Sequence, residues 1–250
     1  MSTDNIRRAA DLLLDARRSG KALAALPDNL IPATVVDAYA VQDLVTAQTG
    51  PIGGWKTAPA KNGEAFNWAP IPAGGIFGNN SEISLTAWPR AMLELEIGLL
   101  LASDLPERGK PYTREDISAT VAEVKVCLEL FASRYADFSA RSPMEKLADS
   151  QNAAGAIIGT GTADWYHLDL SQSKLKLDYA GKHHVATGGS SLDELFEACA
   201  RLANGAIRLG GLKAGQIIIT GARIGPIAAT ETGTARGNIE PVGTVATTFL

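Results

Sequence analysis

The sequence has few of the residues that most disulfide scaffolds and zinc sites require. Its two cysteines, Cys127 and Cys199, lie far apart without metal-ligand spacing, which indicates buried thiols in a reducing compartment. Its three histidines show no zinc-binding spacing, and on a strand His183 and His184 would point to opposite faces. We therefore expect His167 and this pair to be surface residues.

Charge and hydropathy exclude further classes of protein. The 23 basic and 27 acidic residues give a net charge of −4 without a basic cluster, so neither nucleic acid nor an anionic membrane is an expected partner. No apolar run approaches the length of a membrane span, and the charged N-terminus does not resemble a signal peptide. The expected location is the cytoplasm.

Motifs for nucleotides and for serine hydrolases are missing as well. The sequence has neither the glycine-rich phosphate loops nor the nucleophile elbow of those proteins. The glycine-rich segment GTGTA at 159–163 lacks the phosphate-binding lysine, and we expect it to form a hairpin turn.

Capping residues and apolar periodicity predict four helices. In the second, Gln42 falls on an otherwise apolar stripe, so its amide either points inward or lies at the edge of the stripe. The helices are expected over about residues 4–18, after Thr34 with Asp37, after Thr113 with Asp116, and from Ser191 with Glu194 to about Leu209.

Strand patterns dominate the remainder. Apolar residues alternate with polar ones from about 91 to 101 and from 121 to 130. A short strand ending near Lys56 precedes a glycine- and proline-rich stretch up to residue 80, which we expect to be a long lid or binding loop. Further strands are expected at 154–159, 174–182, 215–221 and 242–249. The class is α+β, with a helical N-terminal portion (1–50) and a β-rich body (51–250) in one domain.

Two carboxylates interrupt the apolar stretch AMLELEIGLLLAS at 91–103. Glu94 and Glu96 share one face of the expected strand, roughly 6–7 Å apart at Cα, so they can reach one cation. Glu129, on the polar face of the second strand, can supply a third ligand, although Glu123 fits equally on spacing alone. Oxygen ligands favour Mg²⁺ or Mn²⁺ over zinc. An isolated E-x-E pair also fits a strand face that simply meets water.

A series of segments makes the sequence resemble a known family over nearly the whole chain. It is similar to the 2-keto-4-pentenoate hydratase and 4-oxalocrotonate decarboxylase branch of the fumarylacetoacetate hydrolase superfamily. The resemblance implies a mixed β-roll like the C-terminal domain of that superfamily, and a homo-oligomer. The segments are DAYAVQ (37–42), GGWKTA (53–58), LELEIGLLL (93–101), LELFASR (128–134), LADSQNAAGAIIG (147–159), LKAGQIIITG (212–221) and VGTVATTF (242–249).

The resemblance also assigns site residues. It implies that Glu94, Glu96 and Glu129 bind the metal ion, which decides between Glu129 and Glu123. The implied catalytic residues are Lys56 and Asp149, and the implied substrate-binding residues are Gln42, Ser133, Arg134 and Asn152.

Two departures from the family pattern stand out. The family loop D-N-x-S-S reads Asp-Ser-Gln-Asn-Ala at 149–153, so an amide, Asn152, replaces an expected serine hydroxyl. Asn79 and Asn80 stand where family members often carry an acidic residue implicated in proton transfer.

The implied activity is hydration of a 2-hydroxy-2,4-dienoate to a 4-hydroxy-2-oxo acid. The substrate's C1 carboxylate and C2 oxygen would chelate Mg²⁺ or Mn²⁺, which stabilises negative charge on the C2 oxygen. Decarboxylation of 2-oxo-3-hexenedioate needs the same chelate, and a cation such as Arg134 at the far end of the pocket would favour it. Acylpyruvate hydrolysis ranks third, because no histidine lies near the matching N-terminal segments. A non-catalytic homologue is disfavoured by three converging acids beside Lys56.

Overall fold

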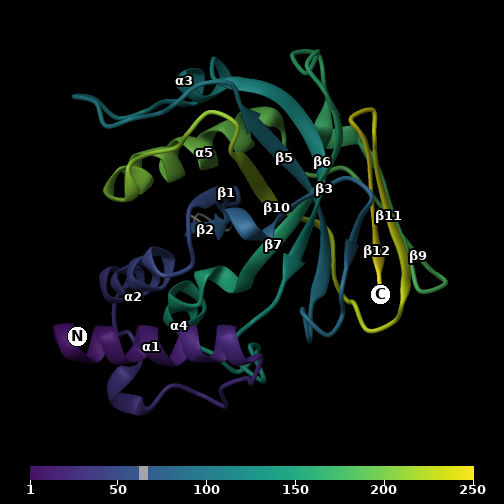
Figure 1. Cartoon of the computed structure of the whole chain (residues 1–250). Helices are drawn as coiled ribbons and strands as arrows, with labels where there is room; N and C mark the ends of the chain where they lie inside the picture. The colour runs from purple at the N-terminus through teal and green to yellow at the C-terminus, as the bar shows by residue number, and fades with distance from the viewer. Residues whose placement is uncertain (62–66) are drawn as a thin grey trace.

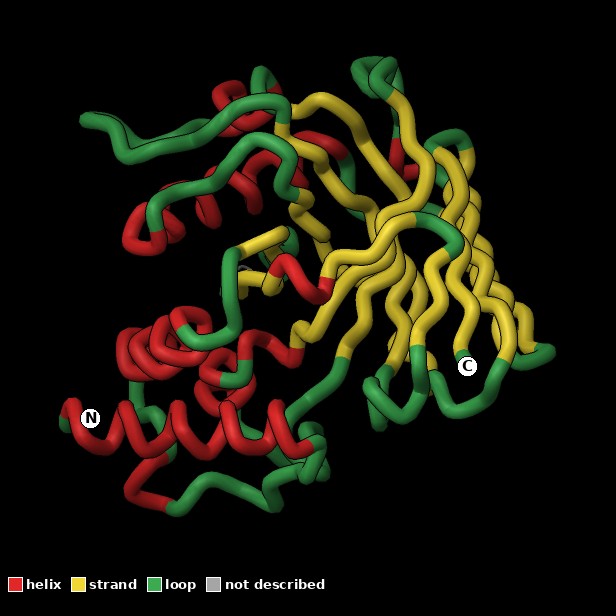
Figure 2. The backbone as a smooth tube through the Cα atoms, viewed as in Figure 1, coloured by secondary structure: helices red, strands yellow, loops and turns green. Residues whose placement is uncertain are grey.

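The computed structural model describes residues 1–61 and 67–250 as a mixed α/β fold with two curled β-sheets. Figure 1 and Figure 2 show α1, α2 and α4 gathered at one side of the sheets, with α3 and α5 above them. The helices are α1 (Thr3–Ser19), α2 (Val35–Ala47), α3 (Arg114–Ser118), α4 (Pro143–Ala148) and α5 (Leu192–Ala206).

Within residues 1–61 and 67–250, the larger sheet has seven strands in the order β2-β1-β10-β5-β6-β7-β3, and the smaller has five in the order β4-β12-β11-β8-β9. Strand β10 therefore lies between β1 and β5, although it comes from the other end of the sequence. The strands are β1 (Ile52–Lys56), β2 (Ala69–Pro72), β3 (Ile76–Gly78), β4 (Ser81–Ile83), β5 (Met92–Leu101), β6 (Val121–Phe131), β7 (Ala153–Thr162), β8 (Lys174–Tyr179), β9 (Lys182–Thr187), β10 (Ile217–Ala228), β11 (Gly233–Glu240) and β12 (Gly243–Phe249).

The four predicted helices are confirmed, and local caps explain where they begin. The Thr34 hydroxyl accepts a hydrogen bond from the backbone N–H of Asp37, and Thr113 and Ser191 each start a helix with a capping box. Helix α4 was not predicted, although it too has a capping box, between Ser142 and Glu145. At six residues it is too short to show an apolar period.

The alternation in β5 and β6 decides which way the acidic side chains point. Leu93, Leu95, Ile97 and Leu99 are buried against the second sheet, in a core shared with Leu177, Val245 and Phe249. Burying each such aliphatic side chain contributes roughly 1.5–3 kcal/mol, so a one-residue slip of register would be costly. The opposite face of β5 therefore carries Glu94 and Glu96, and Glu94 lies 3.7 Å from Lys56 at the end of β1.

Two sequence predictions about glycine-rich segments are wrong. The described part of the expected loop before residue 80 contains β2 and β3, whereas residues 62–66 of that loop lie outside the described residues. Prolines fit in β2 because it is an edge strand. The segment 159–163 is the end of β7 and not a hairpin turn. A Cβ on Gly159 would lie 2.3 Å from the Thr244 carbonyl oxygen, so glycine there permits close strand packing.

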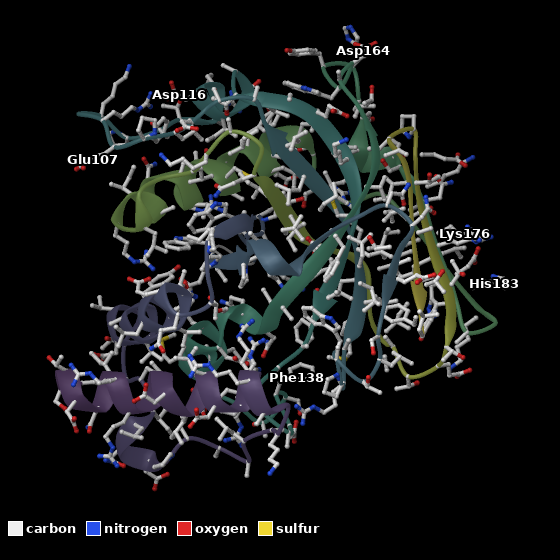
Figure 3. The ribbon with its side chains drawn as sticks, in the orientation of Figure 1. Glu107, Asp116, Phe138, Asp164, Lys176 and His183 are labelled. Atoms are coloured by element: carbon white, nitrogen blue, oxygen red, sulfur yellow. The ribbon has the colours of Figure 1, made fainter. Side chains whose placement is uncertain are left out.

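The strands predicted for the C-terminal half of the chain are also coarser than the structure. The stretch expected as one strand at 174–182 is β8 followed by the turn into β9, and β11 was not predicted. Both cysteines are buried, as expected. His167 and His183 are exposed and His184 is half-buried; Figure 3 shows His183 at the outer edge of the smaller sheet, close to Lys176. Among the described residues, no helix combines the length and hydropathy needed to cross a membrane.

Candidate metal centre and active site

Three glutamates converge on the face of the larger sheet that points away from the core. Glu94 and Glu96 extend from β5, and Glu129 extends from β6 directly opposite Glu94. One carboxylate oxygen from each lies within 4.8 Å of the others. Glu96 and Glu129 are 0% exposed and Glu94 is 7% exposed, so the cluster opens to solvent only at Glu94. The register excludes Glu123, which pairs with Leu100 further along the strand.

Burial makes this cluster unfavourable without a cation. Burial raises the pKa of all three carboxyls, and although Lys56 lowers each value, the neighbouring carboxylates add to the increase. Within the described residues, Glu96 Oε1 is buried without a hydrogen-bond partner. Three carboxylate groups that can serve as oxygen ligands, one of them with a buried oxygen that accepts no hydrogen bond, fit a divalent cation of the Mg²⁺ type.

Lys56 is held against the glutamates at the end of β1. Its Nζ lies 2.7 Å from Glu129 Oε2 and 3.7 Å from Glu94 Oε2, and the side chain is 7% exposed. Burial lowers the pKa of Lys56, but the three carboxylates outweigh this effect and raise it, so the residue is an ammonium. Its place depends on Gly54, where a Cβ would lie 2.8 Å from the Ile217 carbonyl oxygen of β10.

The structure brings Ser133, Arg134 and Asp149 together next to this centre. The Asp149 carboxylate accepts hydrogen bonds from Ser133 Oγ at 3.0 Å, from the Arg134 backbone N–H at 2.9 Å and from Arg134 Nε. The remaining Arg134 nitrogens donate to the carbonyl oxygens of Asp149 and Ala153. Three of the five N–H donors of the guanidinium are thus bonded to the chain, one to the Asp149 carboxylate and two to carbonyl oxygens.

The two amide residues predicted to bind substrate are both buried. Gln42 points inward, and its Nε2 donates to the carbonyl oxygen of Leu147 at 2.9 Å and to that of Trp68 at 3.4 Å. Gln42 Oε1 and Asn152 Oδ1 have no hydrogen-bond partner in the described part of the chain.

Asn79 and Asn80 serve the fold at the turn between β3 and β4. Asn79 Oδ1 accepts a hydrogen bond from the Ala246 backbone N–H at 2.8 Å, which attaches the turn to β12. Asn80 has a φ of 64°, a left-handed conformation that asparagine tolerates.

Sequence reasoning missed the backbone groups that complete the centre. The Gly221 N–H donates to Glu96 Oε2 at 2.7 Å, and the Gln151 carbonyl oxygen lies 3.5 Å from Lys56 Nζ. The Phe131 ring, whose centroid is 5.2 Å from Lys56 Nζ, covers the ammonium from β6. Every residue has the same backbone groups, so no pattern of residue types could have indicated them.

Two curled sheets with a buried carboxylate triad on adjacent strands define the class as an α/β protein with a candidate divalent-metal site. No protein-family profile matches the chain. It is 28% identical over 264 aligned positions to a 2-keto-4-pentenoate hydratase of Burkholderia vietnamiensis, covering 100% of this chain and 99% of the relative. It is 30% identical over 230 positions, 84% of each chain, to a 2-hydroxyhexa-2,4-dienoate hydratase of Comamonas testosteroni.

The solved structures agree with this class. The 4-oxalocrotonate decarboxylase from Pseudomonas putida, complexed with magnesium and adipate, superposes with a TM-score of 0.85 over 100% of this chain and 99% of that one, at 19% identity. The same enzyme has also been solved with calcium and acetate. The chain belongs to the 2-keto-4-pentenoate hydratase family of the fumarylacetoacetate hydrolase superfamily.

Proposed function

We propose that this protein is a divalent-metal-dependent hydro-lyase that adds water to a 2-hydroxy-2,4-dienoate and forms a 4-hydroxy-2-oxo acid. The observation that carries the proposal is the buried triad of Glu94, Glu96 and Glu129 with Lys56 in contact. Its relatives named as hydratases match 84–100% of the chain. The proposed metal ion is Mg²⁺ or Mn²⁺.

The roles of the protein's own groups follow from charge and burial. When bound, the cation supplies a Lewis acid and a template for the substrate's carboxylate and C2 oxygen. Lys56 places a positive charge beside that position, where it stabilises negative charge developing on the C2 oxygen and can pass a proton. Because Glu96 and Glu129 are 0% exposed, water competes little with these interactions.

We assign contact with the substrate to the side chains that have free acceptors. Asn152 Oδ1 and Gln42 Oε1 can each accept a hydrogen bond from a substrate hydroxyl or from the attacking water. Ser133 and Asp149 are bonded to each other, so we assign the first proton-transfer role to Lys56 and keep Asp149 as the second candidate.

Decarboxylation of a 4-oxalocrotonate-type substrate is the second candidate function. The fold match to 4-oxalocrotonate decarboxylase supports it. A decarboxylase must bind a second carboxylate, and Arg134, the cation expected to do so, is bonded to Asp149 and Ala153 instead. This engagement favours the hydratase.

The wider organisation of the chain belongs to the same proposal. We infer a single catalytic domain over residues 1–250, in which the helical portion 1–50 packs on a mixed β-roll formed by 51–250. Hydrogen bonds from Gln42 to the carbonyl oxygens of Trp68, just before β2, and of Leu147 in α4 support this, because they join the helical portion to the body. We further propose a homo-oligomer that acts on a small 2-oxo or 2-hydroxy-dienoate.

An assay of substrate consumption tests the function. Metal-depleted protein is supplied with Mg²⁺ or Mn²⁺ and with a 2-hydroxy-2,4-dienoate, and loss of the ultraviolet absorbance is followed together with formation of the 4-hydroxy-2-oxo acid. Parallel reactions contain 4-oxalocrotonate, with carbon dioxide measured, and an acylpyruvate. Faster turnover of 4-oxalocrotonate than of the dienoate would establish the decarboxylase, and no turnover of any substrate would reject the enzyme.

A further inference from the structure

We infer that Arg134 is a positioning residue for catalysis: it clamps both ends of the strained segment 150–152, whose central carbonyl group orients the Lys56 ammonium. The inference rests on the proposed function, because Lys56 acts there. It gives Arg134 a role in the reaction without contact with substrate.

The segment between α4 and β7 has an unusual backbone. Ser150, Gln151 and Asn152 have φ values of 53°, 51° and 60°, so three consecutive residues other than glycine are left-handed. Each such residue is strained, and a run of them persists only where surrounding contacts fix it. Ser150 and Asn152 are each 4% exposed, so water cannot replace those contacts.

Arg134 supplies contacts at both ends of this segment. Its guanidinium donates to the Asp149 carbonyl oxygen just before the left-handed run and to the Ala153 carbonyl oxygen, at 3.3 Å, just after it. The same guanidinium forms an ion pair with the Asp149 carboxylate, in which the two side chains are 6% and 2% exposed. The planar guanidinium is required, because a lysine ammonium cannot span acceptors at both ends.

The middle of the segment faces Lys56. The Gln151 carbonyl oxygen lies 3.5 Å from Lys56 Nζ, whereas the other polar contacts of Nζ with described residues are to the carboxylates of Glu129 and Glu94. Without this neutral acceptor, the ammonium would settle between the two acids alone. A displacement of about 1 Å of a catalytic group can lower a rate by roughly 100-fold. The clamp thus sets the direction in which Lys56 presents its protons.

The variant Arg134→Lys tests the inference, because it keeps a charge opposite Asp149 but loses the two-ended clamp. We expect kcat to fall by roughly 10- to 100-fold, with KM and Mg²⁺ affinity changed by less than about threefold. Hydrogen exchange at the amides of residues 150–153 should be faster than in the wild type, with β5 and β6 unchanged. Arg141→Lys is the matched control. Arg141 forms an ion pair with Glu145, with 3.5 Å between Nη1 and Oε1, and has no contact with Lys56 among the described residues. This variant should behave as wild type.

A double-mutant cycle separates positioning from other roles. If Arg134 acts through Lys56, Arg134→Lys should lower kcat no further in the Lys56→Ala background. If the double variant loses kcat by the product of the two single losses, the inference is overturned. A rise in KM with kcat unchanged in Arg134→Lys would also overturn it, because that result indicates direct binding of substrate by Arg134. If Arg134→Lys does not fold, Asp149→Asn takes its place in the same cycle, because it weakens the clamp and keeps the backbone acceptors.

The exchange measurement keeps this inference distinct from the proposed function. If the wild-type protein turns over none of the substrates, the proposed function fails. Unchanged exchange at 150–153 in Arg134→Lys then overturns the clamp without any assay of activity, and faster exchange confined to that segment supports it.

Discussion

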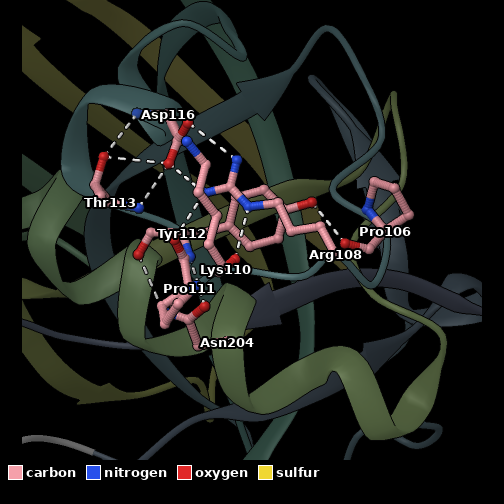
Figure 4. A network of polar contacts seen from close by, with 8 residues as sticks. All are labelled: Pro106, Arg108, Lys110, Pro111, Tyr112, Thr113, Asp116 and Asn204. Atoms are coloured by element: carbon pink, nitrogen blue, oxygen red, sulfur yellow. Dashed lines mark hydrogen bonds and ion pairs between the residues drawn. The ribbon is translucent and has the colours of Figure 1, made fainter.

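Two arginine–aspartate pairs in this molecule use the same chemistry in different surroundings. Arg108 pairs with Asp116 and donates to the carbonyl oxygens of Lys110 at 3.0 Å and Pro111 at 2.8 Å, as Figure 4 shows. Arg134 pairs with Asp149 and likewise donates to two carbonyl oxygens. The side chains of the first pair are 25% and 30% exposed, and those of the second are 6% and 2% exposed.

The difference in burial decides what each pair can do. Around Arg108 water can replace lost hydrogen bonds, so the pair only orders the loop that it shares with Tyr112 and Asn204. The side chains of Arg134 and Asp149 are 6% and 2% exposed, so removal of one partner leaves a charge that is almost completely buried. An ion pair therefore controls backbone geometry strictly only where solvent is excluded, which is the condition at the metal centre.

The largest expected effect comes from Lys56, the buried cation to which we assign the first proton-transfer role. Lys56→Ala should lower kcat by roughly 10²–10⁴-fold, because it removes the charge that stabilises the C2 oxygen and carries the proton. Steady-state kinetics with a dienoate measure this, and a Mg²⁺ titration should show that metal binding survives. Near wild-type turnover would make Lys56 structural and transfer its role to Asp149.

The metal ligands come next in expected effect. Glu96→Gln keeps the shape but removes a negative charge from the donor set, so Mg²⁺ affinity and activity should fall together by roughly tenfold or more. Calorimetric titration of metal-depleted protein measures the affinity. Glu123→Gln is the control, since Glu123 pairs with Lys125 instead and should leave Mg²⁺ affinity unchanged. Unaltered Mg²⁺ dependence in Glu96→Gln would contradict the assigned site.

A smaller effect is expected from pH on the stability of metal-free protein. The pKa of Glu94 is raised by burial from its ordinary 4.5 to about 8, and those of Glu96 and Glu129 are raised too. Between pH 4.5 and about pH 8 the folded protein thus binds more protons than the unfolded chain. The free energy of unfolding therefore falls as the pH rises through this range. With EDTA, Tm at about pH 8 should be lower than at about pH 5.5 by roughly 5 °C.

Magnesium should reduce this dependence, because a cation replaces the protons as the partner of the carboxylates. Thermal unfolding followed by circular dichroism at both pH values, with and without Mg²⁺, makes the measurement. A metal-free Tm that rises with pH would show that the three carboxyls are not the dominant titrating groups.

The smallest effect is expected at the exposed pair. Arg108→Gln should change kcat and KM by less than about twofold, since water compensates for the lost contacts. Limited proteolysis should nevertheless cut the chain near residues 107–111 faster than in the wild type. A loss of activity comparable to that of Arg134→Lys would mean that burial does not distinguish the two pairs.

Local rules predicted those parts of the fold that local contacts determine. Thr34, Thr113 and Ser191 begin helices because each side chain bonds a backbone N–H three residues away, a contact that needs no tertiary structure. Period-two alternation likewise placed Glu94 and Glu96 on one face. Spacing alone left Glu129 and Glu123 open, and the family resemblance chose Glu129. In the structure the register of β6 against β5 places Glu129 opposite Glu94.

Features that depend on distant segments could not be predicted from residue types. β2 contains two prolines, which argue against a strand unless it lies at a sheet edge, and only the assembled sheet shows that it does. The left-handed run at 150–152 contains no glycine, the residue that normally indicates such a conformation. Its cause is the guanidinium of Arg134, sixteen or more residues earlier in the chain.

The central position of β10 has a consequence for how the protein acquires activity. Lys56, the three glutamates and Arg134 all lie in the first 134 residues, yet Lys56 is held on a strand whose partner is residues 217–219 of β10. β10 must insert between β1 and β5 before Lys56 can rest against Glu129. Because contacts between segments so distant in sequence form slowly, we expect the reactive centre to form late in folding. A nascent chain that has not yet reached β10 therefore contains these site residues and remains inactive.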